Sequence, residues 1–205
     1  MNKKKLHIKV CGLTDRNNYK NICELNIEMV GFNFYPKSKR YVNENLYKQV
    51  ENVKRVGVFV QASQDEVLKR KSLFHLDYAQ LHGDESVEEC RAIQGLIPII
   101  KVFRVDESFD MKSTKDFDFC DFFLFDTKVD SYGGSGQKFQ WKKLNEYKGK
   151  VPFMLSGGIG PEDVEAIKKI NHSALMGLDL NSGFEIQAGI KDASLLREFV
   201  YKLSK

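Results

Sequence analysis

Short apolar runs rich in β-branched and aromatic residues alternate along this chain with longer polar stretches that have helical spacing. The runs predict strands over residues 6–11, 29–34, 54–60, 77–81, 98–103, 121–126, 152–156 and 174–180. The stretches predict helices over 15–26, 43–53, 64–74, 86–95, 139–147, 161–170 and 192–203, with a shorter one over 109–117. Strict alternation implies a parallel sheet, because parallel strands need a crossover between them.

Eight strand–helix repeats in 205 residues leave little room for other elements. A closed barrel uses eight such units and has no edge strand, whereas an open doubly wound sheet more often stops at about five or six. The pattern therefore favours an α/β fold, a single-domain (β/α)8 TIM barrel. No linker or low-complexity segment divides the chain, so residues 1–205 are expected to form one domain.

Composition favours a folded cytoplasmic protein with a small ligand. Hydrophobic residues make up 42% and charged residues 29%, a balance that argues against disorder. The net charge of +4 is too weak to indicate nucleic acid, but it is compatible with small anionic substrates. The basic start is followed by His7 and Lys9 rather than an apolar signal core, and no apolar run reaches the roughly 18 residues of a membrane span. We expect neither a nucleic-acid nor a membrane partner.

The chain contains four cysteines, none at metal-ligand spacing: Cys11, Cys23, Cys90 and Cys120. In a chain without a secretory signal, reduced thiols are expected, and no metal site is predicted.

Glycines follow the seventh and eighth predicted strands, in Ser156-Gly157-Gly158-Ile159-Gly160 and in Asp179-Leu180-Asn181-Ser182-Gly183. Glycine lets backbone N–H groups approach an anion, and Pro161 opens a helix whose dipole would add to the attraction. Phosphate sites in such barrels commonly follow these two strands. The pair of loops predicts a phosphate site that includes Gly157, Gly158, Ser182 and Gly183. The alternative is that the glycines only make tight turns.

Cys11 ends the first predicted strand. Alternation places Lys9 and Cys11 on one face, in the barrel mouth, with Ile8 and Val10 on the other face against the helices. A nearby ammonium favours thiolate over thiol, which would suit a catalytic base. The alternative is a buried structural cysteine, the role expected of Cys23, Cys90 and Cys120.

Two aspartates also end predicted strands. Asp126 follows the apolar run 122–125, where a carboxylate is costly unless it is solvated or used, and an acid role would explain it. A cap on the following loop is the alternative. Asp179 ends the eighth strand and is equally ambiguous, since it could instead orient the phosphate loop.

Two further polar residues stand where strands end. Arg40 lies in the loop after the second strand, where it could bind a carboxylate with two parallel hydrogen bonds or belong to a solvated basic loop. His82 ends the fourth strand and is a positioning or structural group more readily than a general base.

Several motifs resemble the phosphoribosylanthranilate isomerase family in order along nearly the whole chain. They are Lys9-Val10-Cys11-Gly12-Leu13-Thr14, Gly31-Phe32-Asn33-Phe34-Tyr35-Pro36-Lys37-Ser38 with Arg40-Tyr41-Val42, Gly57-Val58-Phe59-Val60, Gln80-Leu81-His82-Gly83-Asp84-Glu85, Phe125-Asp126-Thr127, Gly133-Gly134-Ser135-Gly136, Leu155-Ser156-Gly157-Gly158-Ile159, Ser182-Gly183-Phe184-Glu185 and Gly189-Ile190-Lys191-Asp192. Ser156 and Asn181 depart from the residues usual in the family, but no catalytic group is missing.

The resemblance implies an Amadori rearrangement of N-(5-phosphoribosyl)anthranilate in tryptophan biosynthesis. By the same resemblance, Cys11 matches the general base, Asp126 the general acid, and Arg40 the arginine that holds the anthranilate carboxylate. Gly157, Gly158, Ser182 and Gly183 would hold the phosphate, with His82 and Asp179 as further substrate contacts. No cofactor is expected, because proton transfers suffice.

Two alternatives remain open at this point. One is a related histidine-pathway sugar-phosphate isomerase, against which Cys11 and Arg40 argue. The other is a non-catalytic barrel that only binds phosphorylated ligands, against which the pair Cys11 and Asp126 argues. The sequence also leaves open whether the protein is a monomer or a homodimer.

Overall fold

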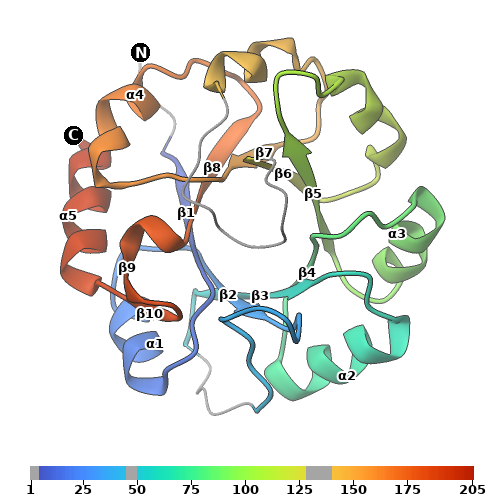
Figure 1. The fold of residues 1–205 in the computed structure, drawn as a ribbon, viewed down its shortest axis with the longest axis horizontal. Helices are drawn as coiled ribbons and strands as arrows, with labels where there is room; N and C mark the ends of the chain where they lie inside the picture. Colours follow the sequence, from blue (N-terminus) through green and yellow to red (C-terminus); the bar gives the residue numbers. More distant parts are fainter. Residues whose placement is uncertain (1–4, 45–49, 128–139) are drawn as a thin grey trace.

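Eight parallel strands close into a barrel in the computed structural model, which describes residues 5–44, 50–127 and 140–205. The strands are β1 (His7–Cys11), β2 (Met29–Asn33), β3 (Lys54–Phe59), β4 (Tyr78–Leu81), β5 (Ile99–Val105), β6 (Phe122–Thr127), β7 (Phe153–Leu155) and β8 (Leu175–Leu180). Each strand pairs with its neighbours in the chain, and β8 pairs with β1 to close the ring (Figure 1). The predicted barrel and all eight predicted strands are confirmed.

The helices surround the barrel (Figure 1). They are α1 (Arg16–Cys23), α2 (Gln64–Phe74), α3 (Val87–Gln94), α4 (Val164–Lys168) and α5 (Ala193–Ser204), with 3-10 helices η1 (Met111–Phe117), η2 (Trp141–Glu146), η3 (Pro161–Asp163) and η4 (Ser182–Phe184). Side chains that cap the first turn explain where several of the helices begin. Ser86 and Glu89 form a reciprocal capping box at α3, and Asp192 accepts from two backbone N–H groups at α5.

Four helix predictions need correction. The described parts of 43–53 are not helical: the guanidinium of Arg70 binds the Asn43 carbonyl, and Asn52 has a left-handed φ of 65°. Residues 45–49 lie outside the described part. In the predicted stretches 109–117 and 139–147, the residues Met111–Phe117 and Trp141–Glu146 form 3-10 helices, a form that proteins use in short pieces, and residue 139 lies outside the described part. The predicted helix 161–170 is a 3-10 turn followed by the five-residue α4.

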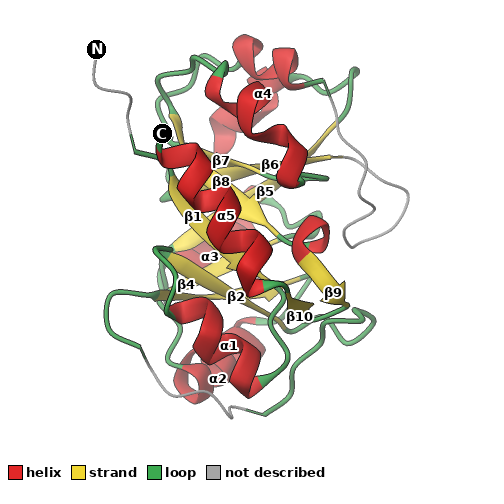
Figure 2. Cartoon of the chain, turned by 90° about the vertical axis from the view of Figure 1, so that its left-hand side faces the viewer, coloured by secondary structure: helices red, strands yellow, loops and turns green. Residues whose placement is uncertain are grey.

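A hairpin that the sequence did not predict follows β8 (Figure 2). Its strands are β9 (Glu185–Gln187) and β10 (Ile190–Lys191), and Gly189 between them has a φ of 89°. Strands this short have too little periodicity to be recognised. The side chain of Asn18 on α1 exchanges hydrogen bonds of 2.7 and 2.8 Å with the Lys191 backbone, so the hairpin is tied to the first helix.

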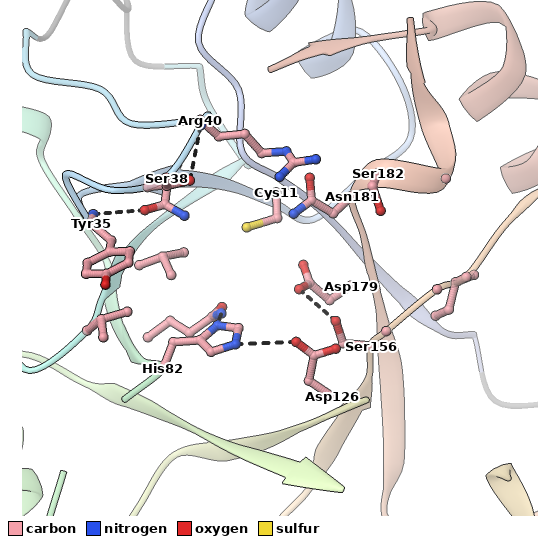
Figure 3. A pocket seen from close by; sticks show the side chains of 18 residues that line it. Cys11, Tyr35, Ser38, Arg40, His82, Asp126, Ser156, Asp179, Asn181 and Ser182 are labelled. Carbon is pink, nitrogen blue, oxygen red and sulfur yellow. Dashed lines mark hydrogen bonds and ion pairs between the residues drawn. The ribbon is translucent and has the colours of Figure 1, made fainter. Parts of the chain in front are cut away.

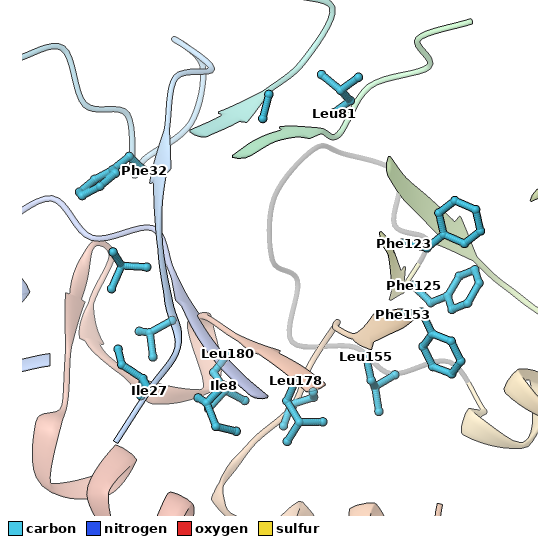
Figure 4. Packing of buried hydrophobic residues seen from close by; sticks show 14 of the residues in the cluster. Ile8, Ile27, Phe32, Leu81, Phe123, Phe125, Phe153, Leu155, Leu178 and Leu180 are labelled. Atoms are coloured by element: carbon cyan, nitrogen blue, oxygen red, sulfur yellow. The ribbon is translucent and has the colours of Figure 1, made fainter. Parts of the chain in front are cut away.

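Buried apolar side chains form two clusters, one on each side of the strands. The larger lies between strands and helices and includes Phe123, Phe125 and Phe153, which point away from the barrel axis (Figure 4). The smaller fills the barrel and includes Phe122 and Leu124. Because neighbouring residues of a strand face opposite sides, the same alternation turns the Asp126 side chain inward at the carboxyl end of β6.

A buried ion pair holds the turn after β4. Lys101 Nζ lies 2.7 Å from Glu85 Oε2, and the two side chains are 4% and 3% exposed. Glu85 Oε1 also accepts the backbone N–H groups of Gln61 and Gly83 at 2.9 and 3.0 Å. One carboxylate thereby ties the turns after β3 and β4 to the barrel interior.

We predict that Glu85→Ala destabilises the fold by about 3–5 kcal/mol, because it leaves the Lys101 ammonium buried without a counter-charge. Urea unfolding followed by circular dichroism measures this change. Glu198→Ala is the control, since Glu198 pairs with Lys202 on the exposed face of α5 and should cost less than about 1 kcal/mol. Equal effects of the two substitutions would contradict the prediction.

Candidate active site

One pocket at the carboxyl end of the barrel contains every site residue that the sequence predicted (Figure 3). Carboxyl ends of barrel strands are the usual place for catalytic groups, and the βα loops supply the rest. The nine residues are Cys11, Arg40, His82, Asp126, Gly157, Gly158, Asp179, Ser182 and Gly183.

Cys11 reaches the pocket from the end of β1, beside a glycine of the neighbouring strand. A Cβ at Gly31 would lie 2.7 Å from the Cys11 sulfur, so only glycine leaves room for the thiol there. Lys9 is on the same inner face, as predicted, but it is fully buried and donates to Asp179 Oδ1 at 2.7 Å. The lysine is thus a fixed charge below the pocket floor.

The protonation of Cys11 is set by opposing effects. Burial raises the pKa of the thiol above its usual value, whereas Lys9 and Lys191 lower it and Asp179 raises it further. Lys9 therefore acts in the expected direction, and burial acts against it, so the pKa of the thiol lies above its usual value. Burial also opposes the charge of Lys9, yet Asp179 and Cys11 overcome it and raise the pKa of Lys9.

Asp126 faces Cys11 across the pocket, and its carboxylate is in polar rather than apolar surroundings (Figure 3). Its Oδ1 accepts the Thr127 N–H at 2.8 Å, and its Oδ2 lies 3.3 Å from His82 Nε2. His82 Nδ1 is 3.2 Å from the amide nitrogen of Gln80, which can only donate. That contact places the imidazole proton on Nε2, facing Asp126.

Asp179 is bound by side chains of two other strands. Besides Lys9, it accepts the Ser156 hydroxyl at 3.3 Å from the end of β7. No sequence pattern had indicated this pairing, although register places Lys9 directly opposite Asp179. Asp179 thus holds the Lys9 ammonium close to Cys11 and still lines the pocket.

Arg40 has an acidic partner that the sequence did not predict. Its Nε and Nη2 donate to the two oxygens of Glu185 at 2.8 and 2.6 Å, and the Arg40 side chain is 12% exposed. Arg40 therefore does not belong to a solvated basic loop. The only hint of this partner in the sequence was that a glutamate directly follows Ser182-Gly183-Phe184.

The two predicted phosphate loops touch one another. A Cβ at Gly183 would lie 2.2 Å from the Ile159 carbonyl oxygen, so glycine is required for the contact. Gly157 and Gly158 have φ values of 87° and 65°, a left-handed region that few other residues adopt. The predicted dipole contribution is smaller than expected, because η3 and α4 replace one long helix. The loop residues Gly133, Gly134 and Gly136 lie outside the described part.

Within residues 5–44, 50–127 and 140–205, no helix is long and apolar enough to cross a membrane. The same residues contain no group of three or more His, Cys, Asp or Glu side chains placed to hold a metal ion.

Comparisons with known proteins agree on one family. A sequence model described as N-(5'phosphoribosyl)anthranilate (PRA) isomerase matches residues 8–202. The N-(5'-phosphoribosyl)anthranilate isomerase of Parabacteroides distasonis is 42% identical over 204 residues, covering 96% of this chain and 92% of the relative.

Two solved structures point to the same family. A phosphoribosyl anthranilate isomerase in complex with reduced 1-(o-carboxyphenylamino)-1-deoxyribulose 5-phosphate has a TM-score of 0.82 and 30% identity, covering 97% of this chain and 98% of that one. Monomers generated from the dimeric Thermotoga maritima isomerase have a TM-score of 0.75 and 29% identity, with the same coverage.

We predict that alkylation of Cys11 by iodoacetamide is slow at pH 7 and rises about tenfold per pH unit up to pH 9, because the thiolate is the reactive form and burial raises the pKa. Lys9→Met should slow the reaction further at pH 8. Mass spectrometry of the Cys11 peptide measures both effects. Cys90 serves as the internal control, since it is fully buried and reacts only if the variant unfolds. A rate already maximal at pH 7 would contradict the prediction.

Proposed function

The chain belongs to the N-(5'-phosphoribosyl)anthranilate isomerase family, and on that premise we propose that Cys11 and Asp126 are the general base and general acid of its reaction. The enzyme converts N-(5-phosphoribosyl)anthranilate to 1-(2-carboxyphenylamino)-1-deoxyribulose 5-phosphate, an Amadori rearrangement in tryptophan biosynthesis. The observation that carries the proposal is that Cys11 and Asp126 face one another across one pocket (Figure 3). The histidine-pathway and non-catalytic alternatives are set aside by the family assignment.

The proposed reaction consists of proton transfers. Asp126, as the carboxylic acid, donates a proton to the furanose ring oxygen. The C1–O bond breaks, and the nitrogen lone pair forms a protonated Schiff base. Cys11, as the thiolate, removes the C2 proton; those electrons form the C1–C2 double bond, and the C=N π electrons return to the nitrogen, which gives a neutral enolamine. The enolamine then tautomerises to the ketone. A separate acid and base in different environments suit this division of roles.

His82 supports the acid in this proposal. Its Nε2 proton faces Asp126 Oδ2, so it stabilises the carboxylate that remains after proton donation. The Thr127 N–H fixes the other carboxylate oxygen. His82 therefore orients Asp126 and contacts the sugar from the same wall of the pocket.

The Lys9–Asp179 pair supports the base. Removing a proton from Cys11 creates a negative charge in a buried place, and the Lys9 ammonium beside it offsets that charge. Asp179 holds the ammonium in position through the 2.7 Å contact. We keep Asp179 as a substrate contact too, because it lines the pocket between Cys11 and Ser156.

The substrate's two anionic ends fit opposite sides of the pocket. Backbone N–H groups of Gly157, Gly158, Ser182 and Gly183 are proposed to bind the phosphate. Arg40 is proposed to bind the anthranilate carboxylate, which supplies orientation by fixing the sugar between the two ends.

We also propose that residues 1–205 form a single domain in the cytoplasm, as a monomer or a homodimer. One apolar cluster extends from β1 to α5, which supports the single domain. All four cysteines are free thiols, which suits a reducing compartment. The dimeric relative from Thermotoga maritima keeps the homodimer open.

Asp126→Asn should lower kcat by about 10²–10⁴-fold and leave KM nearly unchanged, because asparagine keeps the shape and hydrogen bonds but cannot act as a carboxylic acid. Steady-state assays of the loss of substrate fluorescence, together with the melting temperature, measure the effects. Asp121→Asn is the matched control at the opposite end of β6, where Asp121 accepts the Ile99 N–H. Normal turnover by a less stable Asp126→Asn variant would show that Asp126 only caps the loop.

Arg40→Ala should weaken binding of a carboxylate-bearing product analogue by roughly 1.5–3 kcal/mol, the range for a charge-assisted hydrogen bond. Isothermal titration calorimetry with the reduced product analogue measures this change. Lys39→Ala removes a neighbouring exposed charge and should change the affinity little. If the two variants bind the analogue equally well, Arg40 does not hold the carboxylate.

A further inference from the structure

Glu185 is the acceptor at the centre of a buried charge cluster formed with Arg40 and Lys191. Its Oε1 accepts from Arg40 Nε, Lys191 Nζ and the Gly189 N–H at 2.8, 2.6 and 3.0 Å, and its Oε2 accepts from Arg40 Nη2 at 2.6 Å. The side chains of Glu185 and Lys191 are 7% and 0% exposed. The reaction proposed above assigns neither residue a role.

We propose that Glu185 is a positioning residue that orients the guanidinium of Arg40 toward the anthranilate carboxylate. This inference rests on the role of Arg40 proposed above. Glu185 does not touch the substrate in this scheme and acts only through Arg40.

The hydrogen-bonding pattern of Arg40 leaves one edge of its guanidinium for a ligand. A guanidinium has five N–H donors in a planar fork. Glu185 takes the edge made by Nε and one Nη2 hydrogen. Among the described residues, Nη1 has no partner, so Nη1 and the second Nη2 hydrogen form an edge that a planar carboxylate can bind in bidentate fashion. Arg40 lines the pocket, where that carboxylate would arrive.

Glu185 keeps its charge over the working pH range. Burial opposes the charge, but the hydrogen bond from Arg40 and the nearby Lys191 outweigh burial and lower the pKa of Glu185 to about 2. Fixing the long Arg40 side chain before the substrate arrives removes part of the entropy cost of binding. Lys191 supplies a second cation, so the cluster remains attractive to an anion although Glu185 is negative.

Lys191 extends the cluster to the other end of the substrate site. Its Nζ also donates to Asn181 Oδ1 at 2.6 Å, directly before the proposed phosphate residues Ser182 and Gly183. The β9–β10 hairpin therefore fixes the carboxylate end relative to the phosphate end. The Glu185 side chain itself binds Arg40 and none of the proposed phosphate residues, so it is expected to matter only for ligands that carry the carboxylate.

The test compares reduced 1-(o-carboxyphenylamino)-1-deoxyribulose 5-phosphate with the same compound lacking the carboxyl group. Dissociation constants are measured by calorimetry for the wild type, Glu185→Gln, Arg40→Ala and the double variant. We expect Glu185→Gln to weaken binding of the ligand with the carboxylate about tenfold and binding of the ligand without it less than about twofold. The double variant should bind the carboxylate ligand no more weakly than Arg40→Ala alone.

Glu28→Gln is the matched control. Glu28 also accepts hydrogen bonds from a lysine ammonium, that of Lys5, and from a backbone N–H, that of Ile8, but it lies at the opposite end of the barrel. Its substitution should leave the affinities for both ligands unchanged. Glu185→Asp is the second variant if Glu185→Gln does not fold. It keeps the charge on a shorter side chain that cannot reach both Arg40 nitrogens. It should therefore weaken binding of the ligand with the carboxylate and leave binding of the other ligand nearly unchanged.

Equal weakening of both ligands, or additive effects in the double variant, would overturn the inference and leave the role of Arg40 intact. If Arg40→Ala itself fails to discriminate between the two ligands, the proposed role of Arg40 is wrong and the positioning role of Glu185 is overturned with it. The two failures are therefore distinguishable.

Discussion

The pairing of the first and last strands is the constraint on which the rest of the structure depends. It closes the barrel, and its register sets Lys9 of β1 opposite Asp179 of β8. The resulting ion pair is almost completely buried, so neither charge can be removed alone without leaving the other uncompensated. Closure therefore also fixes the ammonium beside Cys11, and the same contact that completes the sheet defines the environment of the proposed base.

Much of the site could be predicted from the sequence because it follows from strand ends. A βα barrel brings the carboxyl ends of all its strands to one face, so residues such as Cys11, Asp126 and Asp179 must meet once the strands are located. The glycines after β7 and β8 were recognisable for the same reason. Their positions required no knowledge of which side chains contact each other.

What the sequence could not provide was the pairing of charges over long separations. Lys9 with Asp179 and Arg40 with Glu185 are 170 and 145 residues apart, and no periodic pattern links such residues. The sequence showed that Lys9 favours the thiolate of Cys11. The pKa of the thiol also depends on how deeply it is buried, which only the packed structure reveals. Helix form was equally dependent on context, since Met111–Phe117 and Trp141–Glu146 have helical spacing but adopt 3-10 geometry.

The acidic partners in these two ion pairs, Asp179 and Glu185, lie in the last barrel strand and directly after it. During synthesis on the ribosome, Lys9 and Arg40 emerge long before these carboxylates exist. A nascent chain that already contains seven strands would have to bury the Lys9 ammonium without its counter-charge, or leave β1 exposed. The barrel is thus protected from closing before β8 is made, and the catalytic pocket takes form only after Asp179 and Glu185 have left the ribosomal tunnel.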